Sequence, residues 1–241
     1  MTAIATKSPT IKETLEERAE SFANLLPKNY PVDRLITGAL VAMQTNPALA
    51  KCTRASLIVA LSRVAQAGLD VGDTAHLVPF GDTATFVADY RGLIKLMVEA
   101  GARKVEAREV RAEDEFSYRY GADPLLTHVP GPNRKAPIVA AYAVVWLRGG
   151  VTQFEVMTAE EIDAIRRSKS KQWKEGPLEA WYGRKCVIRR LAKYVSKSPR
   201  LAVALSSDGD VIDEETGEVL NVPADTVSLP PFQETAAAEI E

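Results

Sequence analysis

Residues 138–157 read IVAAYAVVWLRGGVTQFEVM, two apolar runs on either side of Gly149-Gly150. A pair of glycines between strand-like runs predicts a β-hairpin, because glycine tolerates the positive φ angles of a tight turn. The next residues, Thr158 to Glu161 (TAEE), form a capping box that predicts a helix through Arg167. Antiparallel strands flanked by helices predict an α+β fold, an antiparallel sheet with packed helices, rather than a βαβ series.

Apolar spacing extends this prediction to the rest of the chain. Helical periodicity predicts helices over residues 11–26, 31–46, 53–68 and 90–100. Strands are predicted at 105–110 and 115–120, and the runs 76–80 and 84–88 predict a hairpin around Gly81-Asp82. Residues 121–137 are rich in Pro, Gly and Asn and predict a loop. After a polar loop, Pro177 is expected to open a long helix to about Lys197.

Composition predicts a soluble globular protein. The 241 residues are 46% hydrophobic and 26% charged, and no apolar run approaches the ~18 residues of a membrane span. The first residues lack the apolar region of a signal peptide, so we expect a cytoplasmic protein without a membrane partner. Cys52 and Cys186 lack metal-ligand spacing, and we expect both to be reduced and buried.

The charges separate along the chain. Ten of the 32 acidic residues lie in 207–241 with none of the 30 basic ones, so residues 1–206 carry 22 acidic and 30 basic residues, a net charge of +8. We therefore divide the chain into a helical segment at 1–26, with oligomerisation as its candidate role, a core at 27–206, and an acidic, largely disordered tail at 207–241. The basic core favours a polyanionic partner, and the alternative is a solvated surface with a solubilising tail.

The helix predicted after Pro177 carries the strongest signal for a binding surface. At 100° per residue, apolar residues occupy one arc (Val187, Ile188, Leu191, Ala192, Tyr194 and Val195), and the other arc is basic (Lys185, Arg189, Arg190, Lys193 and Lys197). Neighbouring like charges repel, so an anion is expected on the basic arc, although a solvated face is the alternative. Arg184 projects towards the apolar arc, which makes it a candidate for a buried ion pair.

Two further groups are candidates for the same surface. Trp173 lies among cations that include Lys169 and Lys171, a composition typical of a base-stacking surface, with a core tryptophan as the alternative. Arg91 and Lys95 share a helix face by their spacing of four residues, at the start of the helix predicted from Tyr90. If these elements converge, they form a groove for nucleic acid.

Sequence motifs of covalent chemistry are absent. There is no phosphate-binding loop, no dinucleotide fingerprint, no zinc-protease motif and no hydrolase nucleophile motif. His76 and His128 have no metal-ligand spacing. We therefore predict no catalytic residue, no bound metal and no ATP. An enzyme would instead be a metal-dependent nuclease that uses Asp89, Glu106, Asp114 and Glu115.

Six blocks of sequence resemble the RecT family of phage single-strand annealing proteins. In chain order they are QAGLD (66–70), HLVPFG (76–81), DYRGLI (89–94), EVRAEDEF (109–116), TQFEVMT (152–158) and IRRLAKY (188–194). The resemblance spans about residues 26 to 197. It implies a fold similar to RecT and Redβ and distantly similar to the Rad52 annealing domain.

The resemblance also implies a function. The expected activity is ATP-independent binding of single-stranded DNA and annealing of complementary strands, by a homo-oligomeric ring or helical filament, with Mg²⁺ as a candidate aid. Expected partners are a 5′ to 3′ exonuclease and the host single-strand binding protein, in a bacterial cell with a phage or prophage origin. The matching basic positions are Arg91, Arg184, Lys185, Arg189, Arg190 and Lys193. A passive coating protein and a purely structural oligomer also stay open as functions.

Overall fold

The computed structural model describes residues 10–169, 176–195 and 198–206, together with two short strands at 210–212 and 219–221. The helices described are α1 (Ile11–Glu17), α2 (Ala19–Leu25), α3 (Val32–Thr45), α4 (Arg54–Ala67), α5 (Tyr90–Glu99), α6 (Ala159–Lys169), α7 (Ala180–Ala192) and α8 (Pro199–Ser206). The strands described are β1 (Ala75–Phe80), β2 (Thr83–Ala88), β3 (Lys104–Arg111), β4 (Glu115–Arg119), β5 (Leu125–Val129), β6 (Ile138–Trp146), β7 (Thr152–Thr158), β8 (Asp210–Ile212) and β9 (Val219–Asn221).

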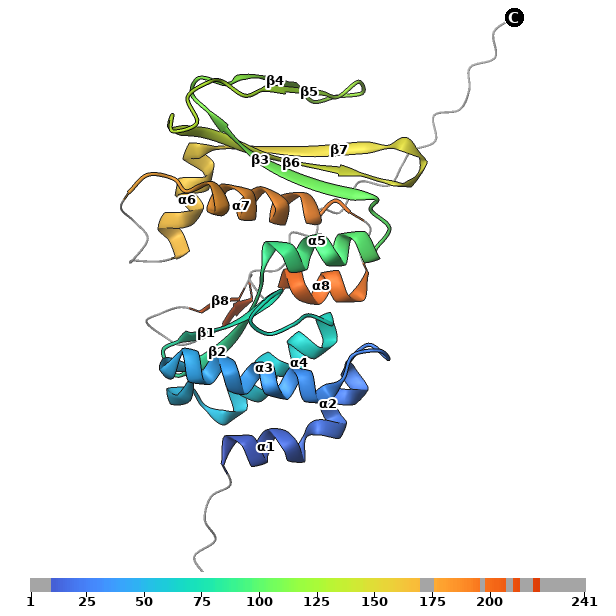
Figure 1. Ribbon diagram of the computed structural model, residues 1–241, viewed down its shortest axis with the longest axis vertical. Helices are drawn as coiled ribbons and strands as arrows, with labels where there is room; N and C mark the ends of the chain where they lie inside the picture. Colours follow the sequence, from blue (N-terminus) through green and yellow to red (C-terminus); the bar gives the residue numbers. More distant parts are fainter. Residues whose placement is uncertain (1–9, 170–175, 196–197, 207–209, 213–218, 222–241) are drawn as a thin grey trace, which may run out of the picture.

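In the N-terminal half, helices α1 to α4 pack on one another, and the β1–β2 hairpin lies against α4 (Figure 1). The predicted caps form: the Thr53 hydroxyl accepts a hydrogen bond from the Ser56 N–H, and Gly68 ends α4 at a φ of 67°. The helix predicted over 11–26 is instead two helices that meet at Arg18, whose ψ of 7° is not helical. Leu15 and Phe22, on either side of the break, are both buried, at 0% and 1% exposure.

The second half is a three-stranded antiparallel sheet in the order β3-β6-β7, with α7 across one face and the β4–β5 hairpin over the other (Figure 1). The hairpin predicted around Gly149-Gly150 is confirmed as β6–β7, with Val144 opposite Phe154. Side chains alternate between the faces of a strand, so Ala141, Ala143 and Val145 of β6 all face α7 and are fully buried. The predicted α+β class is confirmed.

The prediction of a loop over 121–137 is wrong, because β5 lies inside it and pairs with β4. Phe116 of β4 and Leu126 of β5 pack on a small cluster of the sheet formed by Val110, Ala140 and Val156. The flanking Pro and Gly residues concealed a five-residue strand whose stability comes from this contact with the sheet.

The long helix predicted from Pro177 to about Lys197 is also different in the structure. α7 begins at Ala180 and ends at Ala192, and a separate helix, α8, begins at Pro199. The Ser198 hydroxyl accepts the Leu201 N–H, and Pro199 is suited to a first helical turn. Leu201 and Ala204 are fully buried against α4.

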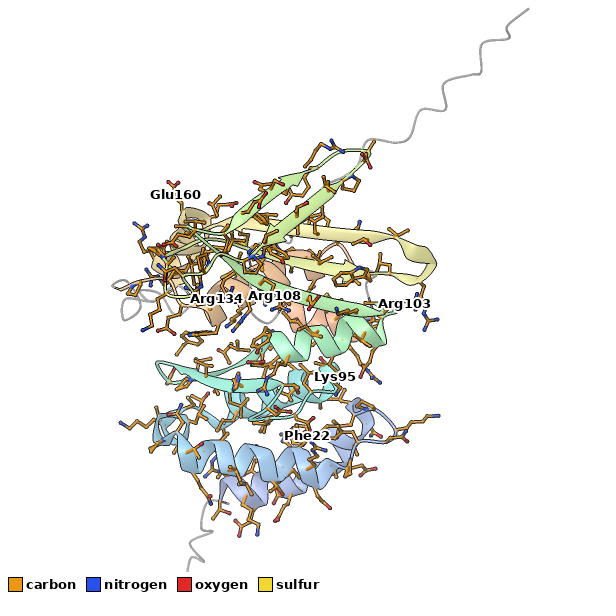
Figure 2. The ribbon with its side chains drawn as sticks, turned by 45° about the horizontal axis from the view of Figure 1, so that its top comes forward. Phe22, Lys95, Arg103, Arg108, Arg134 and Glu160 are labelled. Carbon is orange, nitrogen blue, oxygen red and sulfur yellow. The ribbon has the colours of Figure 1, made fainter. Side chains whose placement is uncertain are left out.

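One hydrophobic core joins the two halves, from Leu15 in α1 to Leu201 in α8. Figure 2 shows Phe22 among the N-terminal helices and Lys95 on α5, nearer the middle of the molecule. Cys52 and Cys186 are buried and are not in a disulfide, as expected. Among the helices described, none is long and apolar enough to cross a membrane. Most of the acidic segment 207–241 lies outside the described residues, apart from the β8–β9 pair.

Candidate nucleic-acid interface

Helix α7 lies on the sheet with the apolar arc that the sequence predicts. Gly183 allows the close approach, since a Cβ there would lie 3.3 Å from the Ala141 Cβ of β6. Two residues differ from the predicted wheel. Tyr194 is 61% exposed although the wheel puts it on the apolar arc, and Cys186 is buried within the basic arc. The buried Cys186 therefore interrupts the basic arc, which is not one continuous stripe of exposed cations.

Two of the predicted DNA-binding arginines have partners within the chain. Both terminal nitrogens of Arg190 donate to Glu161 Oε1, each at 3.0 Å, and this contact joins α7 to the start of α6. The Arg189 Nη2 donates to the Leu205 carbonyl oxygen at 2.6 Å, near the end of α8. Glu161 balances the charge of Arg190, whereas the neutral Leu205 carbonyl only occupies a donor of Arg189, so a phosphate would share both guanidinium groups with the protein.

Lys185 and Lys193 are different. Within the described ranges neither lysine has a carboxylate at ion-pair distance, and Lys193 is exposed. Lys193 is the C-cap of α7 and lies about two turns after Lys185.

Arg184 takes the alternative predicted for it, a partly buried ion pair. Its Nη1 lies 3.3 Å from Glu109 Oε2 on β3. Glu109 also lies 3.5 Å from Arg111 Nη2, and 18% of each of these two side chains is exposed. This network attaches α7 to the sheet.

The two candidates on α5 also have local partners. The side chain of Arg91 binds Asp89 and Asp73, at 3.1 and 3.0 Å, and the hydrogen bond with Asp89 raises the pKa of Arg91. Lys95 donates to the Gly68 carbonyl oxygen at 2.9 Å, which satisfies the C-terminal end of α4. Arg91 is half exposed and stays a candidate for phosphate contact, whereas the ammonium of Lys95 is engaged in the fold.

The polar loop cannot be placed with these groups. Lys171 and Trp173 lie outside the described residues, and Lys169 is the last residue of α6. Their predicted contact with DNA stays a prediction.

The structure also brings together a surface that the sequence pattern did not reveal, on the face of the sheet opposite α7. Lys104 Nζ lies 4.9 Å from the ring centroid of Trp146, a cation–π contact between β3 and β6. Arg108 follows on the same face, and Glu106 binds both cations. Figure 2 shows Arg103, Arg108 and Arg134 spread along the side of the molecule that carries β3. The alternation of Lys104, Glu106 and Arg108 was the available signal.

Aromatic rings continue this face under the β4–β5 hairpin. Phe116 stacks on Tyr142 at 5.7 Å, and Tyr120 stacks on Phe154 at 5.1 Å. Tyr118 lies between Phe116 and Tyr120, at 5.6 and 5.4 Å. Phe116, Tyr118 and Tyr120 thus form a row of rings, and Phe116 and Tyr120 in this row meet rings of the sheet.

The carboxylates that a nuclease would use do not gather. Asp89 caps α5 beside His76 and Arg91, Glu106 lies on β3, and Asp114 is buried beneath the β4–β5 hairpin. Across the described part of the chain, no group of three His, Cys, Asp or Glu side chains is arranged to hold a metal ion.

Asp114 has a structural environment. Its carboxylate accepts hydrogen bonds from the Arg111 and Gly131 N–H groups, at 2.8 and 2.7 Å, and lies 2.9 Å from His128 Nε2. His128 Nδ1 in turn lies 3.2 Å from the Tyr142 hydroxyl. Burial alone would raise the pKa of Asp114, but these hydrogen bonds outweigh it and lower the pKa from 3.8 to about 2. The network fixes the hairpin on the sheet.

Comparison with known proteins identifies the family. The RecT family profile matches residues 33–225. The chain is also 37% identical over 204 residues to Protein RecT of Escherichia coli (strain K12), an alignment that covers 78% of this chain and 76% of that protein. The protein belongs to the RecT family. Membership supports a role in single-strand annealing and DNA recombination. All six sequence blocks that resemble the family lie within the matched residues.

Proposed function

We propose that this RecT protein binds the phosphates of single-stranded DNA and anneals complementary strands in homologous recombination, without ATP. The observation that carries the proposal is the geometry of α7. This helix docks on the sheet of a RecT fold, and its Lys185 and Lys193 lack carboxylate partners within the described residues. Arg91, Arg189 and Arg190 are secondary candidates because the fold already holds their side chains in place.

Annealing requires no covalent chemistry. It requires that two phosphate chains approach each other while their bases stay free to pair. Lysine and arginine contacts neutralise the phosphates and release counterions, and they leave sequence reading to the bases themselves. We therefore assign no catalytic residue, and we propose no cofactor beyond Mg²⁺ as a candidate aid.

Oligomerisation fits the small number of contacts that one chain offers. When successive subunits align their basic surfaces along one strand, weak contacts per subunit add to a tight complex. We propose a homo-oligomeric ring or filament that acts on single-stranded and newly annealed DNA in the bacterial cytoplasm. A 5′ to 3′ exonuclease and the host single-strand binding protein are its proposed partners.

The test is an annealing assay with two complementary labelled oligonucleotides. The full chain is incubated with the first strand, the second strand is added without ATP, and pairing is followed by fluorescence with Mg²⁺ or with a chelator. The same samples are run on a denaturing gel to detect cleavage. We expect faster pairing than without protein, with both strands intact.

Three different outcomes would each contradict the annealing function. Binding with no faster pairing indicates a passive coating protein. Shortened strands in the Mg²⁺ sample alone indicate a nuclease. An absence of salt-dependent DNA binding indicates a structural oligomer.

A further inference from the structure

A small pocket lies where the β4–β5 hairpin, strand β7 and the end of α7 meet. Its volume is about 240 Å³, which is below the roughly 300–1,000 Å³ of pockets for drug-sized ligands. The size suits one planar ring system rather than a whole nucleotide. Its lining includes Tyr120 and Pro124 near the hairpin, Gln153 and Phe154 of β7, Leu191 of α7, and Tyr194 just after α7.

The walls of this pocket are aromatic rings that water still reaches. Tyr194 is 61% exposed and Tyr120 is 50% exposed. Tyr120 is held in place because its ring stacks on Phe154 and its hydroxyl accepts a hydrogen bond from the Val156 N–H at 2.9 Å. The rings of Tyr120, Phe154 and Tyr194 thus line one opening, and the side chains of Tyr120 and Tyr194 are largely exposed. Exposed apolar surface gathered in a concave site marks a binding site.

The floor of the pocket offers hydrogen-bonding groups. Strand β7 is an edge of the sheet, and the Val156 N–H points away from β6 towards Tyr120. Backbone groups alternate in direction along an antiparallel strand, so the N–H and C=O of Phe154 also point outward. In the part of the chain that the structure describes, these two groups have no partner. A donor and an acceptor on one strand edge match the mixed donors and acceptors on the edge of a nucleobase.

Cations border the pocket. Arg190 lies on the last turn of α7, four residues before Tyr194, and Lys193 directly precedes Tyr194. Acidic groups are present too: Glu155 lines the pocket, Glu161 binds Arg190, and Asp123 binds Arg119 at the end of β4. A free anion would meet these carboxylates inside the pocket, whereas a strand could place its phosphates over Arg190 and Lys193 and its uncharged base inside.

We propose that this pocket binds one nucleobase of single-stranded DNA, stacked against the rings of Tyr194 and Tyr120. The inference rests on the proposed DNA-binding function and adds to it a contact with a base. A base–aromatic contact of this kind tolerates any sequence, because every base has a π face. The contact would hold one nucleotide out of the stack and set the register of the strand on each subunit.

The experiment compares Tyr194→Ala with the wild-type chain on two oligonucleotides of equal length, one complete and one with regularly spaced abasic sites. We expect Tyr194→Ala to weaken binding to the complete strand about tenfold and to have little effect on the abasic strand. Tyr194→Phe should retain wild-type affinity, because it keeps the ring. Phe80→Ala is the matched control, since Phe80 is a 43% exposed ring on β1 outside the pocket.

A fluorescent base gives an independent readout. An oligonucleotide with 2-aminopurine should lose fluorescence on binding to the wild-type chain and less on binding to Tyr194→Ala. If Tyr194→Ala binds both oligonucleotides like the wild type and quenches equally, the pocket is not a base site, while the annealing function stands. If Tyr194→Ala changes only the oligomer mass in solution, the pocket is a contact between copies and the proposal is overturned. If the wild type binds no single-stranded DNA, the proposed function fails as well.

Discussion

The carboxylate of Asp114 is almost completely buried, with 2% of its side chain exposed, and three donors converge on it. We expect Asp114→Asn to lower the free energy of unfolding by roughly 2 kcal/mol, because the amide turns a donor towards groups that are donors themselves. Denaturant unfolding measures the effect. Glu115→Gln is the control, since it changes the neighbouring, exposed carboxylate.

The same residue predicts a pH dependence. Its pKa is about 2 in the folded chain against 3.8 without the fold, so the folded state favours the ionised form. The contribution of Asp114 to stability is therefore fully present above about pH 4 and is lost as the pH falls towards 2. Over this pH window the free energy of unfolding of the wild type should fall more steeply than that of Asp114→Asn. Parallel curves would show that the network does not depend on the charge.

Lys185 and Lys193 are the cations that the fold leaves without carboxylate partners in the described ranges. For single strands the slope of log affinity against log salt changes by about 0.7 per phosphate contact. The double variant Lys185→Ala/Lys193→Ala should therefore bind every sequence more weakly, with a slope shallower by about 1.4. Lys12→Ala is the control, because Lys12 is exposed on α1 and binds Glu16. An unchanged slope would place the phosphates elsewhere.

For single residues, the sequence predicts which face of a helix a side chain occupies better than it predicts the partner of that side chain. The apolar face of α7 and the ion pair of Arg184 could be predicted, because helical angle alone separates them from the basic arc. The contact of Arg190 with Glu161 joins residues 29 positions apart, and Arg189 binds a backbone oxygen at Leu205. No local pattern contains such pairs, so helical angle alone overestimates the length of the basic stripe.

Among the elements, the ones with strong local signals were predicted. Gly149-Gly150 marked the β6–β7 hairpin, and the Thr158 capping box marked α6. Strand β5 was missed because what stabilises it is packing on the sheet, through Leu126. The break between α1 and α2 was missed because Leu15 and Phe22 lie seven residues apart, which is also the spacing of one face of a continuous helix.

Packing between elements can be tested at two helical glycines. A Cβ at Gly92 of α5 would lie 2.3 Å from the Thr74 carbonyl oxygen, whereas a Cβ at Gly183 of α7 would lie 3.3 Å from the Ala141 Cβ. Both changes to alanine gain about 1 kcal/mol of helix propensity, but only Gly92→Ala meets rigid backbone. We expect Gly92→Ala to lower the free energy of unfolding by about 1–3 kcal/mol, and Gly183→Ala to change it much less.

Thermal and denaturant unfolding of both variants decide the comparison. Equal losses would mean that α5 can move away from the Thr74 turn as easily as α7 adjusts on the sheet. A loss confined to Gly92→Ala would show that the start of α5, which carries Arg91, is fixed by its contact with this turn.

For the whole molecule, the separation of charge is the main feature that sequence alone provides. Residues 1–206 carry a net charge of +8, and the ten acidic residues of 207–241 reduce the total to −2. A tethered acidic segment is present at high local concentration, so we expect it to compete with DNA for the basic surface. Deletion of 207–241 should tighten binding to single-stranded DNA about tenfold at low salt, an effect that fades near 1 M salt, where the screening length is about 3 Å.

Two matched variants separate charge from structure in this prediction. Deletion of 222–241 removes four of the ten acidic residues and keeps the β8–β9 pair, so its effect should be smaller. A full-length chain with all ten changed to Asn or Gln should bind DNA like the 207–241 deletion, because only the charge is lost. If that chain binds like the wild type while the deletion binds more tightly, the segment acts by occupying space. If all three bind like the wild type, the acidic segment does not reach the DNA surface.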